Sequence, residues 1–438
     1  MRNFFIFSLA VVLGALGASA RVTTVDSVRQ NPGIAGGIYY AYPVAEGTAL
    51  NWTAAPDGYK PFYVSHYGRH GSRYLISDED YLKVVRLLED ADSKNALTPL
   101  GKELKAKIDT IYEEARGRGG ELTPLGARQH RAIAHRLIET NPEIFEGDPL
   151  VTANSTVVMR CAHSMFAFCE GLKEVVPTLN IPRESGQRSM DYLNYHSAES
   201  NRHSGHEGDW YQLWRKFKNR KTNPERLVNT IFSDPEYVAR RVNPEDFMWD
   251  LYWVTVDLQN METPIRLYDL FTAEELYDLW QVFNFNFYAC NSSYPAAKGT
   301  LTDNAKNLVN NILTTAESYI DDNRNGATLR FGHDGNIIPL VALLQLDDCF
   351  AYVSHPDNLA GHYADYSISP MASNLQMIFY KSPDNPEILV RMMLNEREIT
   401  IPAIKTVAPD SPYYSWTELS AWLRKVLDTP SADFINEQ

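Results

Sequence analysis

The sequence has few cysteines and no excess of positive charge. Only 4 cysteines occur among 438 residues, and none of them forms the CxxC pair that is typical of zinc and redox sites. The formal net charge is −14. An acidic chain has no general positive field to attract phosphate backbones, so nucleic acid is not an expected partner. Any anion that this chain binds must therefore meet a local cluster of positive side chains.

The cysteines leave the pattern of disulfides open. If residues 161–169 are helical, Cys161 and Cys169 lie about 12 Å apart along the helix axis. A disulfide needs Cα atoms within about 7 Å of each other, which excludes this pair. Cys290 and Cys349 would then form the bridge, and free buried thiols are an equally good interpretation.

Long apolar runs are missing after the first segment. Residues 1–20, MRNFFIFSLAVVLGALGASA, combine a positive charge at Arg2, an apolar run and small residues at the end. This pattern predicts a cleaved signal peptide and export to the periplasm or the exterior of the cell. An uncleaved anchor is the alternative, which the short apolar stretch disfavours. No later segment is apolar enough to suggest insertion into a membrane.

Five segments have the β-branched and aromatic composition of buried strands. They are residues 62–67, 156–159, 327–332, 376–380 and 388–394. The first three end in charged or imidazole side chains, namely Arg69 with His70, Arg160, and His333 with Asp334. In open α/β sheets the ligand crevice lies beyond the carboxyl ends of the strands. These three ends, distant in the sequence, are therefore predicted to meet at one pocket.

Helical segments lie between the predicted strands. LTPLGKELKAKI (97–108) and LTPLGARQHRAIAHRL (122–137) both place Thr before Pro, a pair that starts a helix as N-cap and first residue. Farther along the chain, helical periodicity covers residues 236–258, 273–290 and 303–320, and strand candidates are scarce.

These patterns predict an α/β fold with a mixed, mainly parallel sheet flanked by helices. Residues 21–170 and 321–438 would form the α/β domain. Residues 171–320 would form a smaller, mostly helical insertion domain that provides one wall of the pocket.

The pentapeptide RHGSR, residues 69–73, is the strongest candidate for a reactive site. Arg69 and Arg73 offer forked donors that match the oxygens of a phosphate, and Gly71 lets the backbone approach a ligand closely. His70 could attack phosphorus through a ring nitrogen and form a covalent intermediate. The alternative is a solvated basic turn with a structural histidine.

Two further segments favour the reactive interpretation. Arg160 follows the second predicted strand and could add a third positive charge. His333 follows the third and offers another donor, while Asp334 could protonate a leaving alcohol and later activate water.

RHGSR resembles the nucleophile motif of the histidine acid phosphatases, branch 2 of the histidine phosphatase superfamily. LTPLGARQ at 122–129, Arg160 and the His333-Asp334 pair follow in the order of that family. The chain length and the segment ILVRMMLNEREITIPA (388–403) are similar to the multiple inositol polyphosphate phosphatases. Members of that group usually carry His-Ala-Glu, whereas His333-Asp334-Gly335 is the pattern of acid phosphatases and many phytases.

The resemblance implies a role for each motif residue. His70 would be the nucleophile that forms a phosphohistidine, and Asp334 the general acid. The phosphoryl oxygens would be held by Arg69, Arg73, Arg160 and His333. The family needs neither a metal nor another cofactor. The expected substrate is a small phosphate ester, with inositol polyphosphates such as phytate as the leading class.

Other functions remain open at this point. A broad-specificity acid phosphatase or sugar phosphatase would use the same residues. A mutase of the same superfamily would transfer the phosphoryl group to an acceptor, which export disfavours. A binding protein without turnover would not need both His70 and Asp334.

Two more polar segments each allow two interpretations. Residues 195–211 contain His203, His206 and Glu207, which resemble a metal cluster, but Gly205 disfavours a helix there and so favours a loop over the pocket. Such a loop would bring His203 or His206 to the substrate.

A basic run covers residues 214–226. It is either a solvated face or a wall for the additional phosphates of a polyphosphorylated substrate. Its members are Arg215, Lys216, Lys218, Arg220, Lys221 and Arg226.

Overall fold

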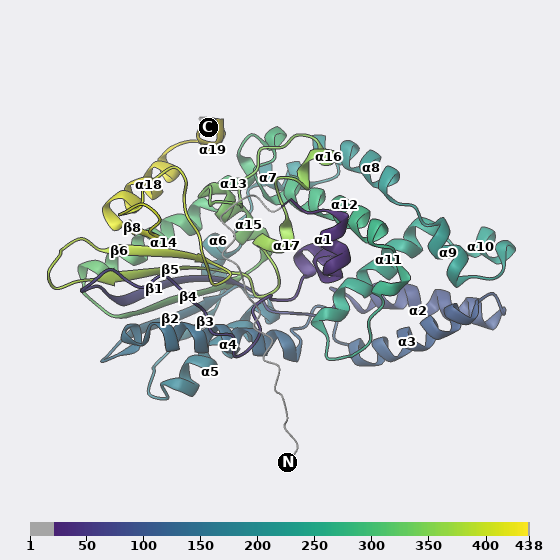
Figure 1. Ribbon diagram of the computed structural model, residues 1–438, viewed down its shortest axis with the longest axis horizontal. Coiled ribbons are helices and arrows are strands. Elements are labelled where there is room, and N and C mark those ends of the chain that lie inside the picture. Colours follow the sequence, from purple (N-terminus) through teal and green to yellow (C-terminus); the bar gives the residue numbers. More distant parts are fainter. Residues whose placement is uncertain (1–21, 437–438) are drawn as a thin grey trace, which may run out of the picture.

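The computed structural model describes residues 22–436, so the predicted signal peptide lies outside the described residues. An eight-stranded sheet forms the centre of one half of the molecule, with helices on both faces, and the other half is helical (Figure 1). Helices α4 and α5 lie on one side of the sheet, and α14 and α18 lie on the other (Figure 1).

The sheet is mixed. Its strands are β1 (Lys60–Arg69), β2 (Leu150–Ser155), β3 (Arg183–Ser185), β4 (Gly326–Gly332), β5 (Asn374–Lys381), β6 (Leu389–Leu394), β7 (Arg397–Glu398) and β8 (Tyr413–Ser415). The order is β3-β2-β4-β1-β5-β6-β7, and β8 pairs with β6. The pairs from β3 to β1 are parallel, and the pairs beyond β1 are antiparallel. The predicted α/β fold class is confirmed.

The α-helices fall into three groups along the chain. Before β3 they are α1 (Val25–Gln30), α2 (Asp78–Ser93), α3 (Pro99–Ala115), α4 (Pro124–Thr140) and α5 (Met159–Val175). Between β3 and β4 they are α6 (Met190–Leu193), α7 (Ala198–Ser204), α8 (Asp209–Lys221), α9 (Glu225–Ile231), α10 (Pro235–Arg241), α11 (Pro244–Asp257), α12 (Ala273–Asn291), α13 (Thr300–Asp303) and α14 (Lys306–Asp321). After β4 they are α15 (Asp334–Leu343), α16 (Pro356–Leu359), α17 (Asp365–Ile368), α18 (Trp416–Asp428) and α19 (Ser431–Asn436).

The two Thr-Pro helix starts are confirmed. The side chain of Thr98 accepts a hydrogen bond from the backbone N–H of Gly101, and α3 begins at Pro99. Thr123 caps α4 in the same way. A side-chain oxygen at the N-cap satisfies a backbone donor that has no partner within the helix, which fixes where each helix begins.

The second predicted strand, 156–159, is wrong. Strand β2 ends at Ser155, directly beside the end of β4, because Ser155 pairs with Phe331. Val157 and Met159 are exposed, and Met159 is already the first residue of α5. The β-branched run at 156–158 thus follows the strand instead of forming it.

The helical half is built mainly from residues between β3 and β4. The predicted segment 236–258 is divided into α10 and α11, because Asn243 caps a new helix that starts at Pro244. Helix α12 matches the predicted segment 273–290 closely. Helices α2 and α3, which precede this region in the sequence, also pack here against α11 and α9 (Figure 1).

The core lies on both faces of the sheet. In β1, Tyr63 and Tyr67 belong to the hydrophobic cluster that continues into the helical half, whereas Val64 belongs to the cluster under α4 and α5. Alternate side chains of a strand point to opposite faces, so both faces of β1 are buried. This explains why the run before RHGSR is almost continuously apolar and aromatic.

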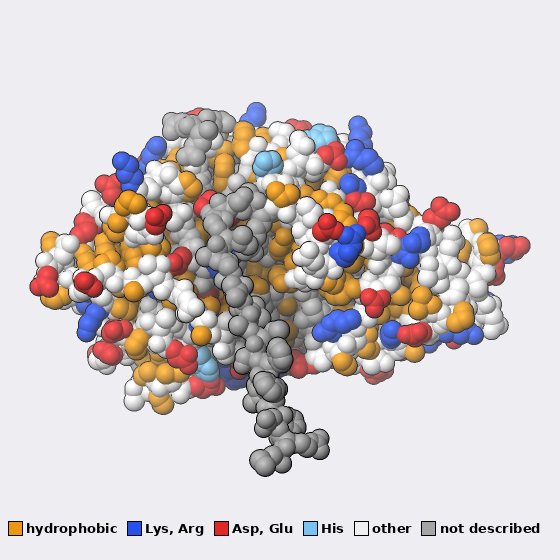
Figure 2. Space-filling view, viewed as in Figure 1, with side chains coloured by type: hydrophobic (Ala, Val, Ile, Leu, Met, Phe, Trp, Pro, Cys, Tyr) orange, Lys and Arg blue, Asp and Glu red, His pale blue; other side chains and the backbone are white. Residues whose placement is uncertain are grey.

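All four cysteines are free thiols, so a Cys290–Cys349 disulfide is not formed and the interpretation as free thiols holds. No helix among residues 22–436 combines the length and apolar character that a membrane span requires. On the face shown in Figure 2, Lys and Arg side chains are scattered among Asp and Glu.

Candidate active site

The loops that follow β1 and β4 are neighbours at one edge of the sheet. Arg69 lies opposite Gly332 in the parallel register, and the backbone N–H of His70 donates to the carbonyl of Gly332 at 3.0 Å. On the other side, the N–H of Ala372 donates to the carbonyl of His70 at 2.9 Å. The predicted meeting of the RHGSR and His333-Asp334 segments at the strand ends is therefore confirmed.

The RHGSR loop is held by the LTPLGARQ segment. Gln129 receives a hydrogen bond from the N–H of Ser72 at 2.9 Å and donates one to its hydroxyl at 2.8 Å. The hydroxyl of Thr123 donates to the carbonyl of Ser72 at 3.0 Å. A Cβ on Gly71 would lie only 2.5 Å from the carbonyl oxygen of Gly126. The two motifs thus fit together only because glycine occupies both positions of closest approach.

The imidazole of His70 is buried and presents one nitrogen to a cavity. Its Nδ1 lies 2.9 Å from the carbonyl oxygen of Gly71. A carbonyl only accepts, so Nδ1 carries the proton and Nε2 keeps its lone pair. Burial lowers the pKa of His70 well below its ordinary value, and the positive charges of Arg69 and Arg160 lower it further. The ring is therefore neutral and able to act as a nucleophile well into the acidic range.

Arg69 is fully buried at the base of the site. One terminal nitrogen donates to the carbonyls of Ile38 at 2.6 Å and Ser369 at 2.7 Å. The other, Nη2, lies 2.8 Å from Oδ2 of Asp334. Burial lowers the pKa of Arg69 to about 10, so it remains charged.

Arg73 stacks on an aromatic ring. Its Cζ lies 4.6 Å from the centre of the Tyr39 ring, and its Nη1 donates to the carbonyl of Tyr74 at 2.8 Å. Burial opposes its charge, but Tyr39, Asp257 and Asp334 leave its pKa above the ordinary value. This packing fixes the guanidinium beside His70 and keeps it protonated.

Arg160 is the second residue of α5, at the positive end of the helix. Burial lowers its pKa, and so does the neighbouring Arg73. Two guanidiniums that repel each other at a helix N-terminus form a place where an anion is favoured.

His333 is the N-cap of α15, and Asp334 is the first residue of that helix. The His333 ring lies 5.7 Å from the His70 ring, and its Nε2 is 3.2 Å from the hydroxyl of Thr156. Burial lowers the pKa of His333 to about 4, although Asp334 raises it. Asp334 accepts from the N–H of Gly335 at 2.8 Å. Burial raises the pKa of Asp334, but Arg69 and His333 outweigh burial and hold it below the usual value.

A cavity of about 380 Å³ brings five of the six predicted residues together. Its lining includes His70, Arg73, Arg160, His333 and Asp334. Arg69, the sixth, adjoins it through Asp334. The remaining lining residues were not identified from the sequence; they are Ile38, Tyr39, Leu75, Ile76, Asp80, Trp253, Phe283 and Phe287. Of these residues, only Phe283 and Phe287 could have been related to each other from the sequence, because residues four apart lie on the same face of a helix.

The segment 195–211 approaches the site at His196, whose ring would lie 3.5 Å from a Cβ on Gly335; burial lowers the pKa of His196, and the charge of Asp334 opposes that effect. Residues 198–204 are helix α7, which ends at Gly205, so the loop interpretation is wrong there. The Nε2 of His203 lies 3.1 Å from the carbonyl of Ala289, and His206 stacks on Tyr211 with ring centres 4.5 Å apart. Neither histidine lines the cavity. Within residues 22–436, no group of three or more His, Cys, Asp or Glu side chains could hold a metal ion.

The basic run on α8 makes contacts elsewhere. Lys221 pairs with Asp278 at 2.7 Å, and Lys218 lies over the rings of Trp214 and Trp249. Arg220 pairs with Asp357. None of these side chains lines the cavity, which favours the solvated face over the wall for additional phosphates.

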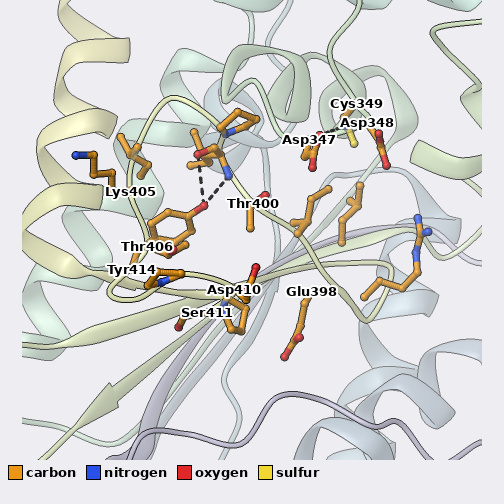
Figure 3. Close-up of a pocket in the computed structure, with 18 of the residues that line it drawn as sticks. Asp347, Asp348, Cys349, Glu398, Thr400, Lys405, Thr406, Asp410, Ser411 and Tyr414 are labelled. Atoms are coloured by element: carbon orange, nitrogen blue, oxygen red, sulfur yellow. Dashed lines mark hydrogen bonds between the residues drawn. The ribbon is translucent and has the colours of Figure 1, made fainter. Parts of the chain in front are cut away.

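A larger hollow, of about 1170 Å³, lies between the segment 397–414 and Asp347–Cys349 (Figure 3). It is lined by acidic side chains, by Lys405 and by the Tyr414 ring, whose hydroxyl accepts from the N–H of Ile401 at 2.7 Å. It contains none of the six predicted residues. The predicted site residues therefore gather at the smaller cavity.

A sequence model of the histidine phosphatase superfamily (branch 2) matches residues 68–395. The chain belongs to this superfamily. The resemblance that RHGSR, LTPLGARQ and the His-Asp pair indicated is confirmed, and with it the expectation of a histidine acid phosphatase. No curated protein matches the sequence.

Solved structures share the fold of this branch 2 phosphatase. The multiple inositol polyphosphate phosphatase of Bifidobacterium longum, in complex with inositol hexasulfate, is 20% identical with a TM-score of 0.75, over 91% of this chain and 99% of its own. The phytase from D. castellii is 17% identical with a TM-score of 0.64, over 90% of this chain and 85% of its own. Likeness at such identities shows a common architecture.

Proposed function

We propose that this phosphatase hydrolyses phosphate monoesters through a phosphohistidine at His70. One observation carries the proposal: one cavity of about 380 Å³ is lined by His70, Arg73, Arg160, His333 and Asp334. The guanidiniums of Arg73 and Arg160 offer forked donors that match the oxygens of a phosphoryl group beside the His70 imidazole.

The reaction proceeds in two steps. In the first, Nε2 of His70 attacks phosphorus, the N–P bond forms and the ester O–P bond breaks. Asp334 gives its proton to the leaving oxygen, which departs as the alcohol. In the second step, the Asp334 carboxylate takes a proton from water, the oxygen attacks phosphorus, and the N–P bond breaks to release phosphate. The proton on Nδ1 stays bonded to Nδ1 throughout and is donated in a hydrogen bond to the carbonyl of Gly71.

The other predicted residues stabilise the transferring group. Arg73, Arg160 and His333 line the cavity, and Arg69 has Nη2 beside Asp334, so their donors surround the space next to His70. Fixed positive charge near the equatorial oxygens favours the transition state of phosphoryl transfer.

An acidic optimum follows from the two titrating groups. His70 stays neutral in acid because its pKa is lowered. Asp334 must be protonated to act, and its pKa is also lowered in the free protein. A bound phosphate dianion opposes the effect of the arginines and raises the pKa of Asp334 in the complex.

The substrate has two candidate classes. Inositol polyphosphates are supported by the fold shared with a protein whose structure contains inositol hexasulfate and with a phytase. A broad-specificity acid or sugar phosphatase is supported by the cavity lining, where the only arginines are Arg73 and Arg160 and no lysine occurs.

Two further proposals concern the chain as a whole. We propose export, supported by the composition of residues 1–20. We also propose that the helical insertion at 171–320 forms one wall of the site, because it contributes Trp253, Phe283 and Phe287 to the lining.

Release of p-nitrophenol from p-nitrophenyl phosphate at about pH 5 tests the function. The wild type is expected to turn over and to show a phosphorylated His70 by mass spectrometry after rapid acid-free quenching. The His70→Ala variant should lose both signals. His135→Ala is the control, because His135 pairs with Glu174 on the surface at 2.7 Å. Absence of release by the wild type would favour a binding protein, and a fully active His70→Ala would remove the mechanism.

A further inference from the structure

Four aromatic rings form a continuous wall along the cavity. Tyr39 contacts Trp253 with ring centres 5.7 Å apart, Trp253 contacts Phe283 at 4.7 Å, and Phe283 contacts Phe287 at 4.8 Å. These four residues, called the aromatic wall below, come from the segment Pro32–Tyr39, from α11 and from α12. The last two contacts are edge-to-face, at 78° and 79°. Arg73 already lies over the Tyr39 ring, so the members of the wall that stay open to a further group are the half-buried Trp253 and Phe287.

The wall is only partly covered by the protein. Tyr39 and Phe283 are nearly buried, whereas Trp253 and Phe287 are half-buried. Ile76, which lines the same cavity, is 52% exposed. Apolar side chains that stay open in the lining of a cavity provide a surface that an apolar ligand can cover.

Of the charged side chains that line the cavity, all but one are proposed to act on the phosphoryl group. Arg73, Arg160 and Asp334 are assigned to the transferring phosphoryl group. The remaining charged lining residue is Asp80, an acid. Its Oδ2 accepts from the N–H of Ser77 at 3.1 Å, as part of the cap of α2, and this bond holds the carboxylate in place.

These features do not suit a substrate with several phosphates. Each additional phosphate would need its own donors, but the lining offers no lysine and no third arginine. It would instead face the fixed carboxylate of Asp80 and aromatic rings, and both disfavour a desolvated anion.

We propose that the site selects small monoesters that carry a single phosphate on an uncharged aromatic group, either aryl or arylalkyl. The aromatic wall holds the ring of the leaving group, and Asp80 rejects substrates with a second phosphate. This inference rests on the proposed hydrolysis and narrows its substrate class.

A matched pair of substrates tests the wall. 2-Phenylethyl phosphate and ethyl phosphate both release primary alcohols, so they differ mainly in the ring. We expect kcat/KM to be roughly tenfold higher for the phenylethyl ester, as expected for one well-packed aromatic contact. Trp253→Ala and Phe287→Ala should bring the ratio close to one. Phe287→Leu, which retains apolar volume, guards against a folding defect and should give an intermediate ratio. Phe166→Ala, an exposed aromatic on α5 outside the cavity, should leave the ratio unchanged.

The outcomes separate the two proposals. Equal kcat/KM for both esters in the wild type overturns the inference and leaves phosphoester hydrolysis intact. Absence of phosphate release from either ester overturns the proposed function instead. A ratio that survives both wall variants also overturns the inference.

Inhibitors that cannot be hydrolysed test the role of Asp80. Benzylphosphonate should inhibit more tightly than inositol hexasulfate. Asp80→Asn should strengthen inhibition by the hexasulfate about fivefold, because one repelling charge near the cavity mouth is removed. It should change inhibition by benzylphosphonate much less. Glu79→Gln is the matched control, since Glu79 is the next residue, pairs with Arg86 and does not line the cavity. Tight hexasulfate binding that does not respond to Asp80→Asn contradicts the proposal.

Discussion

Nη2 of Arg69 lies 2.8 Å from Oδ2 of Asp334. The parallel pairing of β1 with β4 produces this contact, because it places Arg69 opposite Gly332 and so sets the two loops side by side. In the free protein the positive charge of the first motif and the negative charge of the second neutralise each other. In the proposed reaction, a substrate phosphate competes with Asp334 for Arg69, which links binding of the anion to protonation of the acid.

Asp334→Asn is expected to discriminate between leaving groups. For an alkyl phosphate, loss of the general acid should lower kcat by about 10²–10⁴-fold. For p-nitrophenyl phosphate the loss should be much smaller, because nitrophenolate leaves without a proton. Steady-state rates on both esters measure this. Asp347→Asn, in the hollow of Figure 3, is the control. Equal losses on both esters would contradict the acid role.

Arg160→Gln is expected to move the acidic limb of the pH profile. Burial, Arg69 and Arg160 together lower the pKa of His70. Removing one of these positive charges makes protonation of the ring easier, so the pKa of His70 rises. The nucleophile is then lost at a higher pH, and the acidic limb of kcat/KM shifts upward as the overall rate falls. NMR titration of the free protein reports the same pKa directly. A limb that stays in place would show that Arg160 does not act on His70.

Gly71→Ala should disrupt the nucleophile loop. The added Cβ would lie 2.5 Å from the carbonyl oxygen of Gly126, and that oxygen belongs to the backbone of a capped helix and cannot move aside. We expect a loss of about 1–3 kcal/mol in the free energy of unfolding, together with most of the activity. Gly361→Ala is the control, because its Cβ would lie 3.7 Å from the nearest atom. Thermal unfolding and phosphatase assays provide the measurement, and a fully active Gly71→Ala would refute the close fit of the two motifs.

The buried pair Arg136–Glu396 should be important for stability. The two side chains are 7% and 1% exposed and form two bonds, at 2.6 and 2.9 Å. Glu396→Gln leaves the guanidinium of Arg136 buried without its counter-charge, which should lower the free energy of unfolding by about 3–5 kcal/mol. Glu236→Gln, which breaks an exposed pair with Arg240, should have no measurable effect. Denaturant titration distinguishes these outcomes, and equal stability of the two variants would contradict the assignment.

Asp365 should make stability fall as pH rises. Burial raises its pKa to about 7, although Trp280 donates to it at 3.0 Å. The folded state therefore holds this proton more tightly than the unfolded state, whose Asp has a pKa of about 3.9. Ionisation of Asp365 therefore lowers the free energy of unfolding. This loss is absent below about pH 4, grows between about pH 4 and pH 7, and does not increase further at higher pH.

Replacement of Asp365 by Asn removes that loss. The fall in Tm between about pH 5 and pH 8 should be smaller in Asp365→Asn than in the wild type. Asp257, whose pKa burial also raises to about 7, should account for part of the remaining fall. Asp321→Asn, at an exposed carboxyl on α14, is expected to follow the wild type. Parallel curves for Asp365→Asn and the wild type would show that Asp365 does not titrate in this way.

The sequence alone determined the features that depend on neighbouring residues. The Thr-Pro pairs at 98–99 and 123–124 start helices because a cap and a first residue are local interactions. The strands before RHGSR and before His333 were identified from their β-branched and aromatic residues, although β1 also holds His66 and β4 holds Arg330. From these ends, the rule that ligands bind at the carboxyl edge of the sheet was enough to join His70 and Asp334.

Only the tertiary structure decided what surrounds that cluster. Strand β2 was misplaced by a few residues because its bounds depend on pairing with β4, and its own composition is half polar. The aromatic wall joins residues from three segments, and Asp80 comes from a fourth, so no local pattern relates them. Arg220 and Lys221 of α8 form ion pairs with Asp357 and Asp278, because the packing of the helices brings these carboxylates close to them. Contacts between distant elements depend on the arrangement of whole helices in space, and the periodicity of any one helix does not encode that arrangement.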